Sequence, residues 1–230
     1  MVHINGRIGS MSYNIISDRR VFTEGVDYIQ AKYPYYNMEN LTEEYTNKKY
    51  SLQMIENSIK GKLKNEEIFN MMIFDCLIGN SDRHHSNWGV IPYIKKQENN
   101  YHILSKLSPL YDNGSSLCSY VNETDIELIL KDKMKFEALV NTKSKSAIGW
   151  EDVRPIRHFE LLKKLKENYY ALTIQCIKKI KDNINNQNTE SLLNEFEDNI
   201  ISRDMKKLLK LYILERRKRM LEIYNLKDEV

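Results

Sequence analysis

Apolar residues are densest between positions 68 and 78, where Ile, Phe, Met, Cys and Leu side chains occupy nearly every face of a helix. Such a run indicates a helix that is buried all round. Asn65 precedes it as a good N-cap, and the two glutamates that follow suit the positive end of the helix dipole. The run stops at Gly79 and Asn80, a typical helix end, so residues 81–87 leave the core as a polar loop.

Short β-elements are predicted on both sides of this helix. Residues 1–36 mix β-forming and turn residues, which favours one short hairpin. Apolar segments over 88–93 and 101–104 flank a polar stretch, the pattern of a second hairpin, and a polar turn follows at 112–116. Between the two hairpins, positions 40–62 have helical spacing of polar and apolar residues and predict a further helix.

The last third of the chain is predicted to be helical. Helical spacing runs over 156–184, 189–200 and 203–226, and we expect the last two helices to be capped at Asn188 and Ser202. The Asn-rich break between the first two is interpreted as a helix connection. The predicted fold class is therefore mostly α (α+β), with a small β-hairpin beside the polar loops.

The composition describes one soluble domain. The chain has 230 residues, enough for a sizeable core, with 41% hydrophobic and 29% charged residues. Its net charge of +3 is too small to indicate nucleic acid or a membrane as partner. Cys76, Cys118 and Cys176 lack the spacing of a zinc site and are interpreted as buried free thiols. Without a signal-peptide pattern or a long apolar run, we expect a cytoplasmic protein.

Three polar side chains have the order and spacing of a phosphoryl-transfer site. Such a site needs a carboxylate near the accepting hydroxyl, an oxygen ligand for the metal shortly after it, and a second carboxylate that holds Mg²⁺ against the phosphates. Asp82 and Asn87 are five residues apart, as in the protein-kinase catalytic loop, and Asp112 lies at a Gly-containing turn after the second hairpin. Singly, each would more often be an ordinary turn residue, but the combination favours the site.

Two segments carry a resemblance to a known family. They are Ile78-Gly-Asn-Ser-Asp-Arg-His-His-Ser-Asn-Trp-Gly-Val-Ile91 and Leu107-Ser-Pro-Leu-Tyr-Asp-Asn-Gly-Ser-Ser-Leu117, which resemble the HipA-like kinase C-terminal domain and, more distantly, phosphoinositide kinases. The resemblance implies the large lobe of a two-lobed serine/threonine-type protein kinase that uses ATP and Mg²⁺, in a family that includes bacterial toxin and antitoxin kinases. It also implies a catalytic base at Asp82 and magnesium ligands at Asn87 and Asp112.

The other residues of the first loop have more than one interpretation. His84 and His85 could be interpreted as metal ligands, but adjacent histidines in a loop rarely point the same way, and Mg²⁺ prefers oxygen ligands. We therefore expect His84 to pack under the loop and orient it. Arg83 either contacts phosphate or solvates the loop. Asn80 and Ser81 are expected to cap and turn the chain, with Asn80 as a second candidate for nucleotide binding.

On this resemblance, residues 1–230 form one large lobe, with a hinge-proximal segment over 1–36, a catalytic core over 37–150 and a helical tail over 151–230. A kinase also needs a small lobe with a Gly-rich phosphate loop and a strand lysine. No G-x-G-x-x-G occurs, and the first lysine, Lys32, stands in a turn rich in Tyr and Pro. The alternatives are a small lobe on another polypeptide, a truncated chain, and a degenerate protein without activity.

Two further function classes stay open. One is a pseudokinase-type binding module or truncated remnant that docks a protein partner. The other is a nucleic-acid-associated regulator that uses the basic run 216–219 with Lys206, Lys207 and Lys210, although such a run is more often a solvated helix face. For a kinase we expect a protein substrate, an antitoxin or separate small-lobe polypeptide, no membrane, and no direct contact with nucleic acid.

Overall fold

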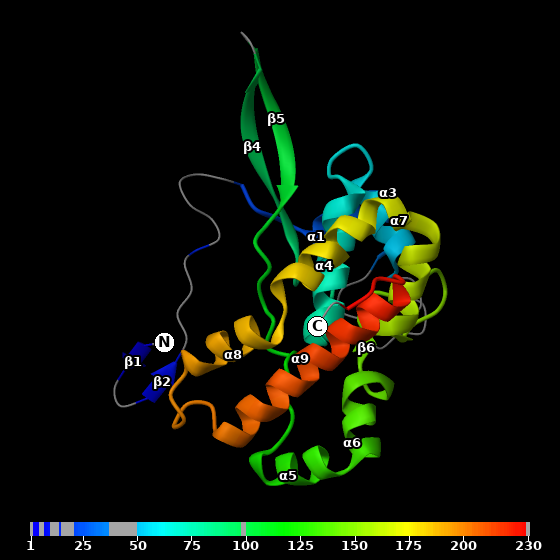
Figure 1. The fold of residues 1–230 in the computed structure, drawn as a ribbon. Helices are drawn as coiled ribbons and strands as arrows, with labels where there is room; N and C mark the ends of the chain where they lie inside the picture. Colours follow the sequence, from blue (N-terminus) through cyan, green and yellow to red (C-terminus); the bar gives the residue numbers. More distant parts are fainter. Residues whose placement is uncertain are drawn as a thin grey trace.

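A computed structural model of the chain describes residues 2–4, 7–9, 14, 21–36, 50–97 and 100–228. This part is mostly helical with small antiparallel sheets, which confirms the predicted fold class. The helices form a body from which one long hairpin projects (Figure 1). In chain order the elements are β1 (Val2–Ile4), β2 (Arg7–Gly9), β3 (Thr23–Glu24), α1 (Gly25–Lys32), α3 (Leu52–Ile59), α4 (Asn65–Ile78), β4 (Gly89–Gln97), β5 (Asn100–Leu107), α5 (Glu123–Lys131), α6 (Lys133–Glu137), η1 (a π-helical turn, Ala138–Thr142), β6 (Lys145–Ser146), β7 (Ile156–Arg157), α7 (His158–Asn183), α8 (Asn186–Asn194) and α9 (Arg203–Ile223).

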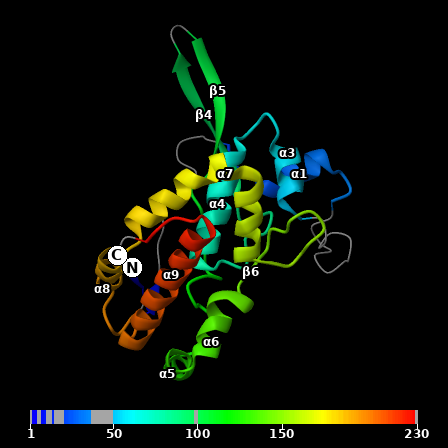
Figure 2. The ribbon, with the colours of Figure 1, turned by 45° about the vertical axis from the view of Figure 1, so that its right-hand side comes forward.

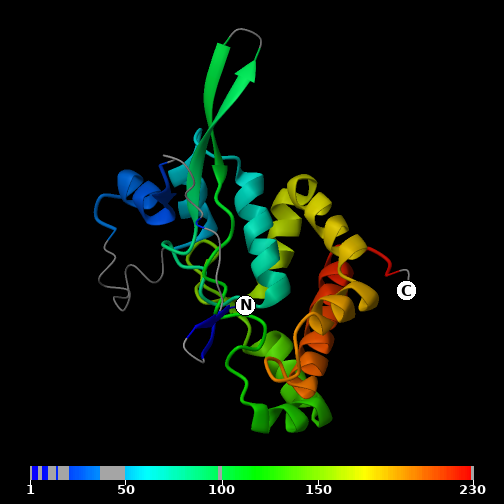
Figure 3. The ribbon, with the colours of Figure 1, turned by 90° about the vertical axis from the view of Figure 1, so that its left-hand side faces the viewer.

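Both predicted hairpins are present. β1 pairs with β2, and of the hinge-proximal residues that follow, 10–13 and 15–20 lie outside the described residues. β4 and β5 pair from Val90 opposite Leu107 to Gln97 opposite Asn100, so both strands run further into the polar stretch than predicted. β3 pairs with the base of β4 and completes a sheet in the order β3-β4-β5. The outer part of the hairpin extends beyond the helices (Figure 3).

Helix α4 lies at the centre of the helical body (Figure 2) and contacts α7 and α9. Its Ile68, Phe69 and Ile73 side chains are fully buried, as its apolar pattern predicts. Lys64 occupies the N-cap position, so the prediction of Asn65 as the cap is wrong. The Asn65 amide is used elsewhere, because it donates a hydrogen bond of 2.7 Å to Glu56 Oε1.

The other predicted helices need corrected boundaries. Helix α3 is shorter than the prediction over 40–62 and begins after Ser51, while positions 40–49 lie outside the described residues. Helix α8 is capped by Asn185, whose Oδ1 accepts from the Asn188 backbone at 2.8 Å, so the predicted cap at Asn188 is wrong. Ser202 caps α9 as predicted. Helix α7 is kinked at Tyr169, where φ is −137° and ψ is 33°.

The segments α5, α6 and η1 are absent from the prediction. Among the residues of α5 only Ile126 is buried, and α6 buries none of its five residues. Segments of five to nine residues are shorter than the window over which helical periodicity can be recognised, so the sequence pattern did not select them.

The basic run near the end of the chain is not a solvated helix face. Arg216 and Arg217 are buried within α9, and Arg219 forms an ion pair with Glu137. Two of the lysines also pair with carboxylates of the neighbouring segment, Lys206 with Asp198 at 2.9 Å and Lys210 with Glu190 at 2.7 Å. Both interpretations of this run, solvated face and nucleic-acid contact, miss the burial of its first two arginines.

The three cysteines are free thiols, of which Cys76 and Cys118 are buried and Cys176 is half-buried. Burial raises the pKa of Cys76 to about 11 and that of Cys118 to about 12, so both are protonated at neutral pH. Across the described ranges, no three His, Cys, Asp or Glu side chains gather as a metal cluster. In the same ranges no helix has the length and hydropathy needed to cross a membrane.

Gly79 ends α4 with a left-handed φ of 70°, and a Cβ at this position would lie 1.9 Å from Tyr212 Oη. Gly61 has the same backbone sign, with φ of 74°, but a Cβ there would meet nothing within 4 Å. We expect Gly61→Ala to cost about 1 kcal/mol from left-handed strain, and Gly79→Ala about 3 kcal/mol or more because overlap is added. Urea unfolding of both variants measures this; equal losses would contradict the close approach of α9.

Candidate active site

Asn80, the first loop residue after the Gly79 cap, holds the loop from inside. Its Nδ2 donates to Asp75 Oδ1 at 3.1 Å, and its Oδ1 accepts from the Asp82 backbone N–H at 3.0 Å. Its backbone carbonyl accepts from His158 Nε2 at 2.9 Å. Asn80 is only 1% exposed. The expected turn role is therefore what the geometry shows, while the side-chain amide faces the protein interior and not a nucleotide site.

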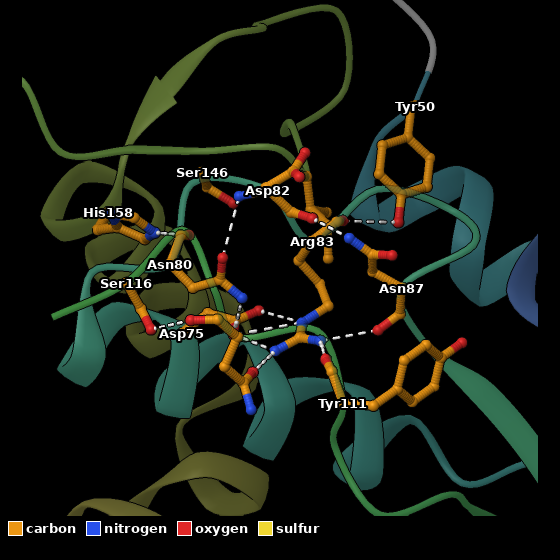
Figure 4. A network of polar contacts seen from close by, with 12 residues as sticks. Tyr50, Asp75, Asn80, Asp82, Arg83, Asn87, Tyr111, Ser116, Ser146 and His158 are labelled. Carbon is orange, nitrogen blue, oxygen red and sulfur yellow. Dashed lines mark hydrogen bonds and ion pairs between the residues drawn. The ribbon is translucent and has the colours of Figure 1, made fainter. Parts of the chain in front are cut away.

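Arg83 is the most heavily bonded side chain of the site and is 1% exposed. Its guanidinium forms an ion pair with Asp75 at 2.8 Å, and Nη1 donates to the carbonyl oxygens of Asn87 and Tyr111, each at 2.7 Å. Nη2 also donates to Asn113 Oδ1 at 2.6 Å. Figure 4 shows the guanidinium among Asp75, Asn87 and Tyr111. Both sequence interpretations of Arg83 are wrong, because the side chain neither solvates the loop nor keeps an N–H free for phosphate.

The Arg83 contacts join the two polar loops. Tyr111 and Asn113, which Arg83 binds, are the neighbours of Asp112, so the guanidinium fixes the chain on both sides of that carboxylate. Tyr111 Oη donates back to the Ser86 carbonyl at 2.7 Å. Asp112 itself has a φ of 50° and an exposed side chain. The structure therefore brings the segment around Asp112 against the segment around Asp82, although they are thirty residues apart.

Asn87 faces the backbone of Asp82. Its Nδ2 donates to the Asp82 carbonyl at 2.7 Å, and its backbone N–H donates to the His84 carbonyl at 3.0 Å. Because a carbonyl only accepts, this contact fixes which amide atom is nitrogen and leaves Oδ1 directed elsewhere. The Asp82 side chain is exposed. Two exposed carboxylates and one oriented amide oxygen thus belong to loops held together by Arg83.

His85, rather than His84, is the ring packed under the loop. His85 is 4% exposed, its Nδ1 lies 2.8 Å from Tyr36 Oη, and the rings of Tyr36 and Tyr50 meet it edge-on. Burial, with the nearby His84 and Arg154, lowers the pKa of His85 to about 4. His84 is half-buried, and its Nδ1 accepts from the Ser86 backbone. The packing role expected for His84 therefore belongs to His85.

Sequence reasoning missed two residues of this network. Asp75 is a single acidic residue on a buried helix face, and that isolation is the signal that could have found it. Tyr50 is fully buried, donates to the Arg83 carbonyl at 3.1 Å and accepts from Trp88 Nε1 at 3.0 Å. It falls inside the helix predicted over 40–62, where periodicity marks its ring as a core position and gives no signal for the contacts of its hydroxyl.

Comparison with protein families agrees with this arrangement. The family described as the HipA-like C-terminal domain matches residues 18–195, a range that includes both loops and the hairpin between them. The chain belongs to the HipA-like C-terminal domain family.

A kinase is among the relatives of this HipA-like domain. The serine/threonine-protein kinase CtkA of Helicobacter pylori is 24% identical over 161 residues, which are 67% of this chain and 47% of that protein. The crystal structure of the H. pylori proinflammatory kinase CtkA superposes with a TM-score of 0.66 at 17% identity, over 90% of this chain and 70% of that one. The HipA-like domain thus has a kinase-like large-lobe fold and spans about half the length of the relative it matches in sequence.

Removing the charge of Asp75 tests the ion pair at the centre of the HipA-like domain. Asp75→Asn leaves the buried Arg83 guanidinium without a counter-charge, which costs about 3–5 kcal/mol of the free energy of unfolding. Glu127→Gln is the matched control, because it breaks an ion pair whose carboxylate is 75% exposed. Urea unfolding should show a large loss for Asp75→Asn alone, and a loss no larger than that of the control would contradict the role of the pair.

His85 makes the stability of the domain depend on pH. Its ordinary pKa of 6.5 falls to about 4 on folding, so the unfolded chain binds the proton more tightly. The contribution of neutral His85 to the free energy of unfolding is therefore present in full above pH 6.5 and is lost as the pH falls toward 4. At pH 5 the loss is about 1–2 kcal/mol once screening by solvent is included. His85→Asn keeps a polar atom for Tyr36 and cannot titrate. The free energy of unfolding of this variant should fall less between pH 7 and pH 5 than that of the wild type. The same pH dependence in both proteins would refute the role of His85.

Proposed function

We propose that this domain transfers the γ-phosphoryl group of ATP to a serine or threonine hydroxyl of a protein substrate. The observation that carries the proposal is the Arg83 clamp, which holds the Asp82–Asn87 loop against the Asp112 turn. The family and the CtkA relative support a kinase-type enzyme. ATP, Mg²⁺, a cytoplasmic location and the toxin–antitoxin context are parts of the proposal that come from the family resemblance.

In this mechanism each loop residue has a separate task. Asp82, exposed and fixed through its backbone by Asn80 and Asn87, accepts the proton of the substrate hydroxyl and orients it for attack. Asn87 Oδ1 and the Asp112 carboxylate are hard oxygen donors, the ligand type that Mg²⁺ takes together with phosphate oxygens. They would hold the metal, which neutralises charge on the phosphates when bound. Arg83 holds the geometry and touches no substrate.

A protein kinase also needs a small lobe that binds the phosphates of the nucleotide. The segment described by the structure is large-lobe in character, and the chain spans 47% of the length of the CtkA relative. We propose that a second segment or polypeptide completes the nucleotide site. An antitoxin is a further proposed partner.

The proposal is tested by two carboxylate variants in the full-length protein. Asp82→Asn should keep Mg²⁺-dependent ATP binding, seen as a thermal shift, and lower transfer of labelled phosphate by about 10²–10⁴-fold, because a general base is lost. Asp112→Ala should lose both the Mg²⁺-dependent shift and transfer. Glu167→Gln removes an exposed charge on α7 and serves as control.

Retained transfer in Asp112→Ala would refute the metal role, and lost ATP binding in Asp82→Asn would refute the base assignment. Absence of transfer and of any nucleotide shift in the wild-type protein would instead favour a binding module that docks a partner.

A further inference from the structure

Helix α9 reaches the candidate catalytic loop through a continuous line of buried polar groups. Arg216 on α9 is 0% exposed, and its Nη1 donates to Ser144 Oγ at 2.8 Å. Ser144 Oγ lies 2.9 Å from His158 Nδ1, and His158 Nε2 lies 2.9 Å from the Asn80 carbonyl (Figure 4 shows this last contact). Asn80 in turn accepts from the backbone N–H of Asp82.

The direction of every bond in this line is fixed. The Asn80 carbonyl only accepts, so His158 Nε2 must carry the proton. Burial lowers the pKa of His158 to about 3, so the ring is neutral and Nδ1 must accept. Ser144 therefore donates its hydroxyl proton to Nδ1, and its oxygen is left to accept from Arg216. Removal of Arg216 would leave Ser144 with an unused acceptor and the line without its first donor.

Arg216 also holds the end of α4. Its Nε donates to the Cys76 carbonyl at 2.7 Å, and Nη1 donates to the Val140 carbonyl. Cys76 lies in the last turn of α4, where carbonyls lack helical partners and carry partial negative charge. No carboxylate in the described ranges forms an ion pair with Arg216, and the rings of Phe159 and Tyr212 lie against its guanidinium, at 4.9 and 5.3 Å.

We propose that Arg216 is a positioning residue for the Asn80–Asp82 segment. It fixes the start of this segment by two routes, through the last turn of α4 and through the Ser144–His158 relay, which ends on the Asn80 carbonyl. Arg216 lies outside residues 18–195, the range that the family model matches. This role rests on the proposed kinase function when the measurement is phosphoryl transfer.

Substitutions at three positions separate positioning from folding. Arg216→Lys keeps the charge, but the three donors of an ammonium share one nitrogen and cannot reproduce the planar fork that spans Cys76, Val140 and Ser144. Ser144→Ala interrupts only the relay. His158→Gln keeps an N–H for the Asn80 carbonyl, whereas His158→Leu removes it. Arg219→Gln is the matched control, because it deletes another α9 guanidinium, one that pairs with Glu137.

In the full-length protein we expect Arg216→Lys, Ser144→Ala and His158→Leu each to lower kcat about tenfold, the effect of one lost hydrogen bond, with KM for ATP unchanged. His158→Gln should recover most of the loss. The loss in the Arg216→Lys/His158→Leu double variant should be smaller than the product of the single losses, because both act through one line. Lower melting temperatures with unchanged kcat would overturn the proposal.

Hydrogen exchange gives a readout that does not depend on catalysis. The Asp82 amide should exchange several-fold faster in Arg216→Lys and Ser144→Ala than in wild type, and at the wild-type rate in Arg219→Gln. Unchanged exchange in the relay variants would refute positioning. If the wild-type protein transfers no phosphate, the proposed function fails, while the exchange result still decides the role of Arg216.

Discussion

The buried ion pair between Asp75 and Arg83 is the interaction on which both loops depend. Removing the two charges from water costs several kcal/mol per ion, and burial accordingly raises the pKa of Asp75 while Arg83 opposes the rise. The pair instead holds the Arg83 guanidinium in one fixed orientation. A guanidinium has five N–H donors in one plane, and here they are directed to Asp75, two backbone carbonyls and Asn113. A lysine ammonium cannot join two loops in this way.

Order along the chain made much of this site predictable. The apolar run of α4 ending at Gly79 indicated where the polar loop leaves the core, and the hairpin pattern indicated that the chain returns beside it. The kinase-like spacing of Asp82, Asn87 and Asp112 then selected residues that the structure places on two adjoining loops. The helix end, the hairpin and the loop spacing are determined by residues close together in the sequence, so the sequence pattern predicts them.

The burial of charged side chains could not be predicted in the same way. Arg83 and Arg216 stand in polar or basic segments and look like surface residues, because the acceptors that satisfy them come from positions such as Tyr111 and Val140 that only the fold brings near. Asn185 and Asn188 are equally good caps by residue type, and α8 begins after the first of them, with Asn188 inside the helix. His84 and His85 are adjacent residues of one type, and only the fold determines that the ring of His85 is the one that meets Tyr36.

Helix α9 has a further consequence for what counts as one folding unit. Leu208, Tyr212 and Met220 are buried in the same core as α4, although the family match ends at residue 195. A fragment cut at that boundary would open the core to water and leave the Cys76 carbonyl without its Arg216 donors. The family match therefore ends before the packed core does, because the core extends to Tyr224, which bonds back to Thr173 on α7.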